Sequence, residues 1–94
     1  MKALRWNSEK NEALKRERGV SFEQVLYYIR EGGLLDILEH PNREKFGHQQ
    51  ICLVEMQEYA YLVPFVEDSE QVFLKTIIPS RKATRHYLKD RKNE

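Results

Sequence analysis

The stretch that decides the fold is residues 50–66, which read QICLVEMQEYAYLVPFV. Apolar side chains recur at alternate positions in both halves, and β-branched and aromatic residues are frequent, which is typical of strands. The dipeptide Gln57-Glu58 separates the halves and predicts a hairpin turn. Pro64 has no N–H to donate, so we expect an edge, a strand end or a bulge there.

Further strand signals lie on both sides of this hairpin. Residues 34–38 and 72–78 are short apolar runs bounded by turn residues, and Leu4 and Trp6 give a brief alternation near the start. Sequential strands with short links form an antiparallel sheet. The sequence therefore predicts a small antiparallel sheet of three to four strands.

Two helices are predicted before the sheet and one after it. Residues 9–18 are rich in Glu, Lys, Arg and Ala, which are good helix formers. Ser21 and Gln24 form a capping box ahead of apolar residues at helical spacing over 22–29. A short helix is expected over about 81–89. The fold class is therefore α+β, with two N-terminal helices packed on the sheet and a short C-terminal helix.

Length and composition favour one domain, 1–94, in the cytoplasm. The chain has 94 residues, of which 40% are hydrophobic and 33% charged. No apolar run approaches the roughly 20 residues that span a membrane, and we see no secretion signal at the N-terminus. Cys52 is the only cysteine, so it forms no internal disulfide, and its apolar neighbours predict that it is buried.

The net charge of +1 conceals a strong asymmetry. Residues 1–30 carry seven bases and four acids, residues 31–70 two bases and nine acids, and residues 71–94 seven bases and two acids. If the two ends meet, they form a basic face that would attract a polyanion such as RNA. Alternatively, these charges belong to solvated helix faces.

Metal and nucleotide-cofactor motifs are absent from the sequence. His40, His48 and Cys52 have no further soft ligand nearby to complete a metal site. The four glycines lack phosphate-loop and dinucleotide spacing, and there is no nucleophile elbow. We therefore predict neither a metal nor a cofactor.

The strongest candidate constellation lies near the end of the chain. Arg81, Lys82 and Arg85 fall in the first turns of the predicted last helix, where Arg81 and Arg85 share a face. Two guanidinium groups side by side suit a phosphate. Alternatively, these arginines form salt bridges with acids of the sheet. Those acids would be Glu39, Glu55 and Asp68.

RNA cleavage without a metal uses the 2′-OH as nucleophile and needs a base, an acid and cations for the phosphate. His40 is a candidate proton-transfer residue because it sits in a predicted loop and imidazole titrates near neutrality. The alternative for His40 is a solvated loop residue. We expect His86 on the solvent side of the last helix, and the tyrosine spacing favours packing over base stacking.

Two segments also resemble a known family. Residues 6–11, WNSEKN, lead into residues 14–22, LKRERGVSF, and residues 77–85 read IIPSRKATR. The first resembles the opening of BrnT-type toxins, a tryptophan–acid start followed by a lysine-rich helix, a glycine and a phenylalanine. The second is similar to the closing Arg-Lys-Ala-Thr-Arg run of the same toxins.

The resemblance implies a RelE-like fold and a ribonuclease toxin that halts translation. It also implies a cognate ribbon–helix–helix antitoxin, through which the complex would contact operator DNA. Lys15, Arg81 and Arg85 match basic positions of the family pattern. Arg18 stands where a histidine is common in the family, and His40 stands where an acid is usual.

Three hypotheses follow. In the first, a toxin ribonuclease uses Arg81 and Arg85 on the scissile phosphate and His40 in proton transfer. Lys15, Arg18 and Lys82 then lie along the RNA backbone. In the second, a non-catalytic module docks an antitoxin or an RNA, and the acidic stretch 55–70 meets a basic partner. The third is a structural domain of a larger assembly.

Overall fold

The structure is a computed structural model that describes residues 2–39, 44 and 49–88. These residues form three helices and six strands, which confirms the predicted α+β class. The elements are β1 (Ala3–Trp6), α1 (Ser8–Arg18), α2 (Phe22–Arg30), β2 (Leu34–Glu39), β3 (Gln49–Met56), β4 (Tyr59–Glu67), β5 (Gln71–Leu74), β6 (Ile78–Pro79) and α4 (Arg81–Tyr87).

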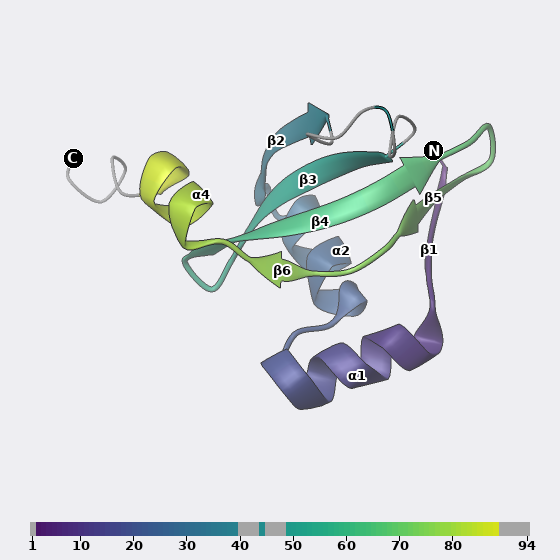
Figure 1. Ribbon diagram of the computed structural model, residues 1–94, viewed down its shortest axis with the longest axis horizontal. Helices are drawn as coiled ribbons and strands as arrows, with labels where there is room; N and C mark the ends of the chain where they lie inside the picture. The colour runs from purple at the N-terminus through teal and green to yellow at the C-terminus, as the bar shows by residue number, and fades with distance from the viewer. Residues whose placement is uncertain (1, 40–43, 45–48, 89–94) are drawn as a thin grey trace.

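The sheet is mixed and has the strand order β1-β5-β4-β3-β2, with β6 also paired to β4 (Figure 1). The pairs β2–β3, β3–β4 and β4–β5 are antiparallel, as predicted, but β1 runs parallel to β5. The prediction of three to four antiparallel strands was therefore wrong in strand number and in the direction of β1. The helical crossover between β1 and the rest of the sheet is long enough to let β1 pair in parallel.

The run that we predicted as one strand over 72–78 is divided into β5 and β6. Along β4, Phe65 pairs with Leu74 and Leu62 pairs with Ile78. Between these two pairs, the segment that joins β5 to β6 contains one residue more than the facing part of β4. The break lies opposite Pro64, which offers no N–H but accepts a 2.8 Å hydrogen bond from the backbone N–H of Lys75. Proline thus interrupts the neighbouring strand while β4 itself continues.

The predicted hairpin turn is confirmed at Gln57-Glu58. Both residues have a left-handed backbone conformation, with φ of 54° at Gln57 and 64° at Glu58. A two-residue link of this kind matches the twist of the flanking strands, although glycine and asparagine adopt it more readily. The turn therefore carries local backbone strain.

The two faces of the sheet are covered differently. On one face, α2 packs against β3, and α1 lies along the lower edge of the sheet in Figure 1 rather than flat on it. The expectation that both N-terminal helices cover the sheet thus holds for α2, while α1 contributes chiefly Leu14. The main core unites Leu14, Val20, Phe22 and Val25 with Cys52, Val54, Val63 and Leu74.

The short helix α4 covers part of the opposite face. Side chains alternate along a strand, so Leu53 of β3 faces away from Cys52 and Val54. Leu53 packs with Ala60, Ala83 and Leu88 in a second, smaller cluster. Each face of the sheet therefore has its own apolar contacts.

Cys52 is buried, as predicted, with 9% of its surface exposed. Burial raises the pKa of its thiol to about 11. The thiol is thus protonated near neutral pH and is no nucleophile. Among the described helices, none has the length and apolar character needed to cross a membrane.

A buried amide links α1 to α2. Asn11 is 3% exposed, and its side-chain oxygen accepts a 2.8 Å hydrogen bond from the backbone N–H of Phe22. Its amide nitrogen donates to the carboxylate of Glu23, also at 2.8 Å. This second bond is the main reason that the pKa of Glu23 lies below its ordinary value of 4.5.

Replacing Asn11 with Ala is expected to lower the free energy of unfolding by about 2 kcal/mol, because the Phe22 N–H is left buried without its partner. Urea unfolding at neutral pH measures the change. The contribution of the Glu23 carboxylate is present above pH 4.5 and is lost as the pH falls through its lowered pKa. Glu23→Gln, whose side-chain oxygen still accepts from Asn11, is the control and should cost much less. Equal losses for both variants would contradict the assigned role of Asn11.

Candidate functional site

The helix α4 presents the basic residues that the sequence singled out. Arg81, Lys82 and Arg85 are all exposed. Ser80 caps the helix, because its hydroxyl accepts a 3.0 Å hydrogen bond from the N–H of Ala83. The salt bridges among the described residues join Lys2 to Glu67 and Lys15 to Glu12. The alternative in which Arg81 and Arg85 pair with acids of the sheet stays a prediction.

Two hydrogen-bonded contacts fix α4 to the sheet. Thr84 accepts from the backbone N–H of Ala60 at 2.8 Å and donates to the carbonyl oxygen of Ser80 at 2.8 Å. Tyr87 donates from its hydroxyl to the carboxylate of Asp36 on β2 at 2.9 Å. That bond raises the pKa of Tyr87. The basic side chains therefore project from a helix whose position on the sheet is defined.

A pocket of about 360 Å³ lies between α4 and the sheet, and we call it the α4 pocket. Leu38, Ile51, Leu53 and Leu62 contribute apolar side chains to its lining, and Glu39, Ser80, Lys82, Ala83, His86 and Tyr87 complete it. Lys82 and His86 are four residues apart and so share the helix face that borders the pocket. Arg81 and Arg85 are likewise four apart on a neighbouring face.

His86 is the residue that the sequence undervalued. It is exposed, as expected, yet it also borders the α4 pocket beside Lys82. Its ring meets the ring of Tyr87 edge-on, with 4.9 Å between the centroids. The i, i+4 spacing from Lys82 is the sequence signal that would have found it. His40, the predicted proton-transfer residue, lies outside the described residues.

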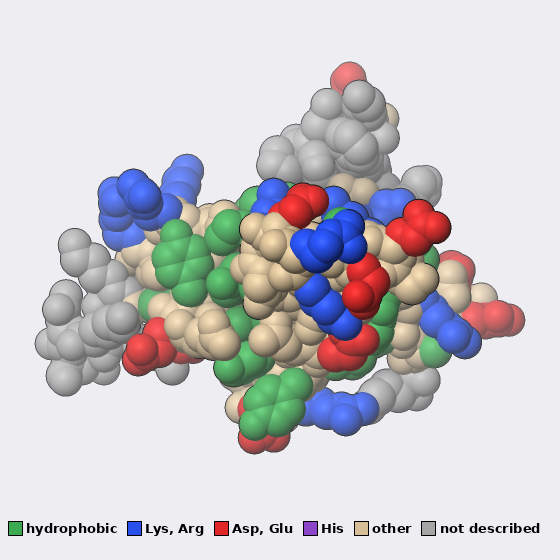
Figure 2. Space-filling model, turned by 90° about the horizontal axis from the view of Figure 1, so that it is seen from below, with side chains coloured by type: hydrophobic (Ala, Val, Ile, Leu, Met, Phe, Trp, Pro, Cys, Tyr) green, Lys and Arg blue, Asp and Glu red, His purple; other side chains and the backbone are tan. Residues whose placement is uncertain are grey.

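Lys15 and Arg18 belong to a different part of the surface. On α1, Lys15 pairs with Glu12 at 3.0 Å, and this contact raises the pKa of Lys15. Arg18 donates a 2.6 Å hydrogen bond to the carbonyl oxygen of Ile77, so its guanidinium links α1 to the segment before β6. Figure 2, seen from the side of α1, shows basic and acidic side chains interleaved over α1, with a separate basic group at the left end near α4. In this view the basic side chains of α1 and those near α4 therefore form separate groups and not one continuous basic face.

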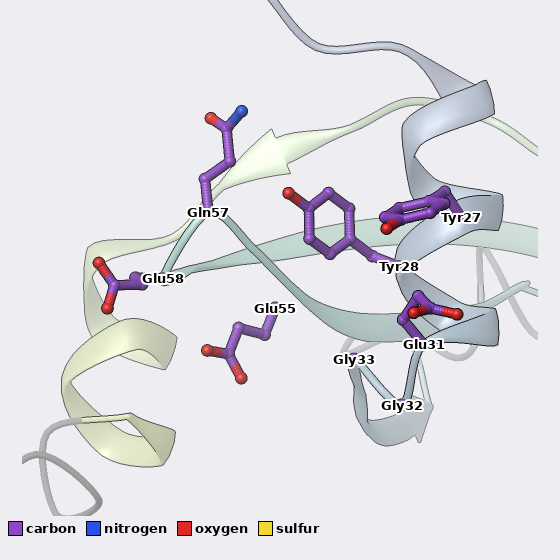
Figure 3. A pocket seen from close by; sticks show the side chains of 8 residues that line it. All are labelled: Tyr27, Tyr28, Glu31, Gly32, Gly33, Glu55, Gln57 and Glu58. Atoms are coloured by element: carbon purple, nitrogen blue, oxygen red, sulfur yellow. The ribbon is translucent and has the colours of Figure 1, made fainter.

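A second pocket, of about 440 Å³, lies between the end of α2 and the β3–β4 turn (Figure 3). We call it the tyrosine pocket, and its lining is Tyr27, Tyr28, Glu31, Gly32, Gly33, Glu55, Gln57 and Glu58. The rings of Tyr27 and Tyr28 meet edge-on, with centroids 5.3 Å apart. The sequence favoured packing for these tyrosines, and it placed Glu58 in the hairpin turn and Glu55 among the acids of the sheet. It did not predict the pocket, because local patterns do not show that α2 lies beside the hairpin turn.

The segments 6–22 and 77–85, on which the expected family resemblance was based, meet in the fold. Within the first, the ring of Trp6 stacks on that of Phe22 at 5.6 Å. The hydrogen bond from Arg18 to Ile77 joins the first segment to the second. Comparison with models of protein families, with curated proteins and with solved structures finds no match for this chain.

Proposed function

We propose that this protein is a BrnT-like toxin of RelE-like fold that cleaves RNA without a metal and so inhibits translation. The observation that carries the proposal is the arrangement of α4. Lys82 and His86 border a largely apolar pocket, and Arg81 and Arg85 are exposed on the neighbouring face of the same helix. An apolar cavity with a few convergent polar groups is the usual form of a small-molecule or nucleotide site.

In the proposed reaction, the 2′-oxygen of one nucleotide attacks the adjacent phosphorus and the bond to the 5′-oxygen breaks. The products carry a 2′,3′-cyclic phosphate and a 5′-OH. A base takes the proton of the 2′-OH and an acid returns one to the leaving oxygen, so the protons balance. Arg81 and Arg85 stabilise the charge on the crowded phosphate.

His86 is the proton-transfer group that the described pocket offers, and His40 stays a candidate for the same task. The pocket's apolar side chains give a nucleobase a surface to lie against, and Lys82 at the same pocket suits the neighbouring phosphate. Lys15 and Arg18 are candidates for RNA contacts outside the pocket. A cognate ribbon–helix–helix antitoxin in the cytoplasm would neutralise the toxin and carry it to operator DNA.

The second candidate function is a non-catalytic module that docks an antitoxin or an RNA. One observation favours it. The ring of His86 packs edge-on against the ring of Tyr87, and an aromatic ring does not orient an imidazole for proton transfer as a hydrogen-bonded carboxylate does. In that case the α4 pocket would bind a nucleotide of the RNA, and the RNA would not be cleaved.

The test is to incubate the purified protein, freed of any partner, with mixed-sequence RNA in excess EDTA. Fragments with 2′,3′-cyclic phosphate and 5′-OH ends are expected, because the proposed chemistry needs no metal. A parallel reaction with the same RNA on translating ribosomes detects a toxin that cuts RNA only on the ribosome. Intact RNA under both conditions would contradict the ribonuclease, and retention of the RNA in a gel-shift experiment would then favour the binding module.

A further inference from the structure

We propose that the tyrosine pocket binds the guanidinium group of an arginine that projects from a basic segment of a partner protein. The proposal is independent of the ribonuclease, because the tyrosine pocket and the α4 pocket have no lining residue in common. It rests on the shape of the pocket, on its aromatic wall and on its charge.

The aromatic wall comes from α2. Tyr27 is 59% exposed, the largest fraction among the exposed large hydrophobic residues of the described chain. In Figure 3 the ring of Tyr28 points from α2 toward Gln57 in the hairpin turn, and Tyr27 lies beside it. The two rings stand at 87° to each other. A cation held in this pocket lies beside two aromatic rings, and the face of such a ring attracts a cation through the ring quadrupole.

The charge of the pocket is negative. Glu31, Glu55 and Glu58 contribute carboxylates, and the lining contains no lysine, arginine or histidine. Glu31 lies at the end of α2, and Glu55 and Glu58 lie on β3 and in the turn that follows it. In the described part of the chain, no group of three or more His, Cys, Asp or Glu is arranged to hold a metal ion. The lining therefore suits an organic cation better than a metal.

A guanidinium group fits a pocket with an aromatic wall and carboxylates better than an ammonium group does. It is planar and weakly hydrated, so it can stack on a tyrosine while its N–H groups donate to carboxylates on either side. The whole chain has a net charge of only +1, so attraction of a basic segment to this place is local rather than a property of the whole surface. The pocket thus selects both charge and shape.

The base of the pocket is rigid. The N–H of Gly33 donates to the carbonyl of Tyr28 and its carbonyl accepts from the N–H of Glu55, both at 2.7 Å. A Cβ at Gly33 would lie 2.8 Å from each of the carbonyl oxygens of Tyr28 and Glu55, so only glycine fits between α2 and β3. The opposite rim is the left-handed turn at Gln57 and Glu58. The pocket is therefore formed before a partner arrives, which reduces the entropy cost of binding.

The experiment titrates the whole protein with a short capped arginine peptide and follows the tyrosine ring resonances by NMR. The matched probes are the same peptide with citrulline, which has the shape without the charge, and with lysine, which has the charge without the planar group. We expect saturable shifts of the Tyr27 and Tyr28 resonances with the arginine peptide, weaker binding of lysine and none of citrulline.

Two variants test the wall and the charge separately. Tyr27→Ala and the double variant Glu31→Gln/Glu58→Gln are each expected to weaken binding of the arginine peptide about tenfold. Tyr27→Phe keeps the ring and should bind like the parent protein. Glu70→Gln removes one charge from the exposed β4–β5 turn, outside the pocket, and should leave the affinity unchanged.

Three results would overturn the proposal. The first is absence of saturable binding by the arginine peptide. The second is equal binding of the arginine and citrulline peptides. The third is an equal loss in Glu70→Gln and in the pocket variants, which would mean that diffuse electrostatic attraction is responsible. Since RNA cleavage is not a readout here, failure of the ribonuclease proposal would not affect any of these outcomes.

Discussion

Replacing Arg81 and Arg85 together with Ala is expected to lower the rate of RNA cleavage by about 100- to 1,000-fold, because donors aimed at developing phosphate charge contribute that much in comparable sites. Both side chains are exposed, and the contacts that hold α4 to the sheet come from Thr84 and Tyr87 instead. The double variant should therefore fold normally. The measurement compares cleavage rates of the purified proteins with the growth of cells that express them.

The matched control removes two cations from another helix. Lys10→Ala/Arg16→Ala takes the same charge from exposed positions of α1 and should leave cleavage nearly unchanged. A single His86→Ala substitution is expected to lower the rate by about 100-fold, in the range typical of a proton-transfer residue. Full cleavage by a folded Arg81→Ala/Arg85→Ala protein would refute the site on α4. Normal cleavage by His86→Ala alone would return the proton-transfer role to His40.

Phe22→Ala is expected to lower the free energy of unfolding by about 3–5 kcal/mol, the usual cost of removing a fully buried aromatic ring. Phe22 is 0% exposed and its ring stacks on Trp6, so the substitution opens a cavity between β1 and α2. A domain of this size is stable by only about 5–14 kcal/mol. The variant should therefore unfold at much lower urea concentration than the parent protein.

Phe22→Leu is the control for that experiment. Leucine fills most of the same space, so a loss of about 1–1.5 kcal/mol is expected. Urea midpoints of the three proteins, followed by tryptophan fluorescence and circular dichroism, give the comparison. If Phe22→Ala were as stable as Phe22→Leu, the stacking of β1 against α2 would contribute little to the fold.

Features that depend on residues close together in sequence were predicted well. The capping box of Ser21 and Gln24 is fully formed at the start of α2. The turn at Gln57-Glu58 is also where the sequence put it. Side-chain hydrogen bonds and backbone preferences within three or four residues decide these features, so they can be predicted without the rest of the chain.

The candidate site shows the same difference between features set by near neighbours in the sequence and features set by distant segments. The position of Arg81, Lys82 and Arg85 in the first turns of the last helix followed from the local sequence pattern. The α4 pocket and the tyrosine pocket did not, because each is closed by segments far apart in the sequence. His86 acquires a possible role only once α4 lies on the sheet, and Tyr27 only once α2 lies beside the β3–β4 turn.

The sequence by itself determined the α+β class, the starts of the helices to within a residue, the hairpin turn and the position of the basic residues in the first turns of α4. The tertiary structure decided that β1 runs parallel to β5, that α1 lies at the sheet edge and that the two pockets form. The physical reason is the range of the interactions. Capping and turn hydrogen bonds act between near neighbours, whereas strand pairing and burial depend on which distant surfaces together exclude the most water.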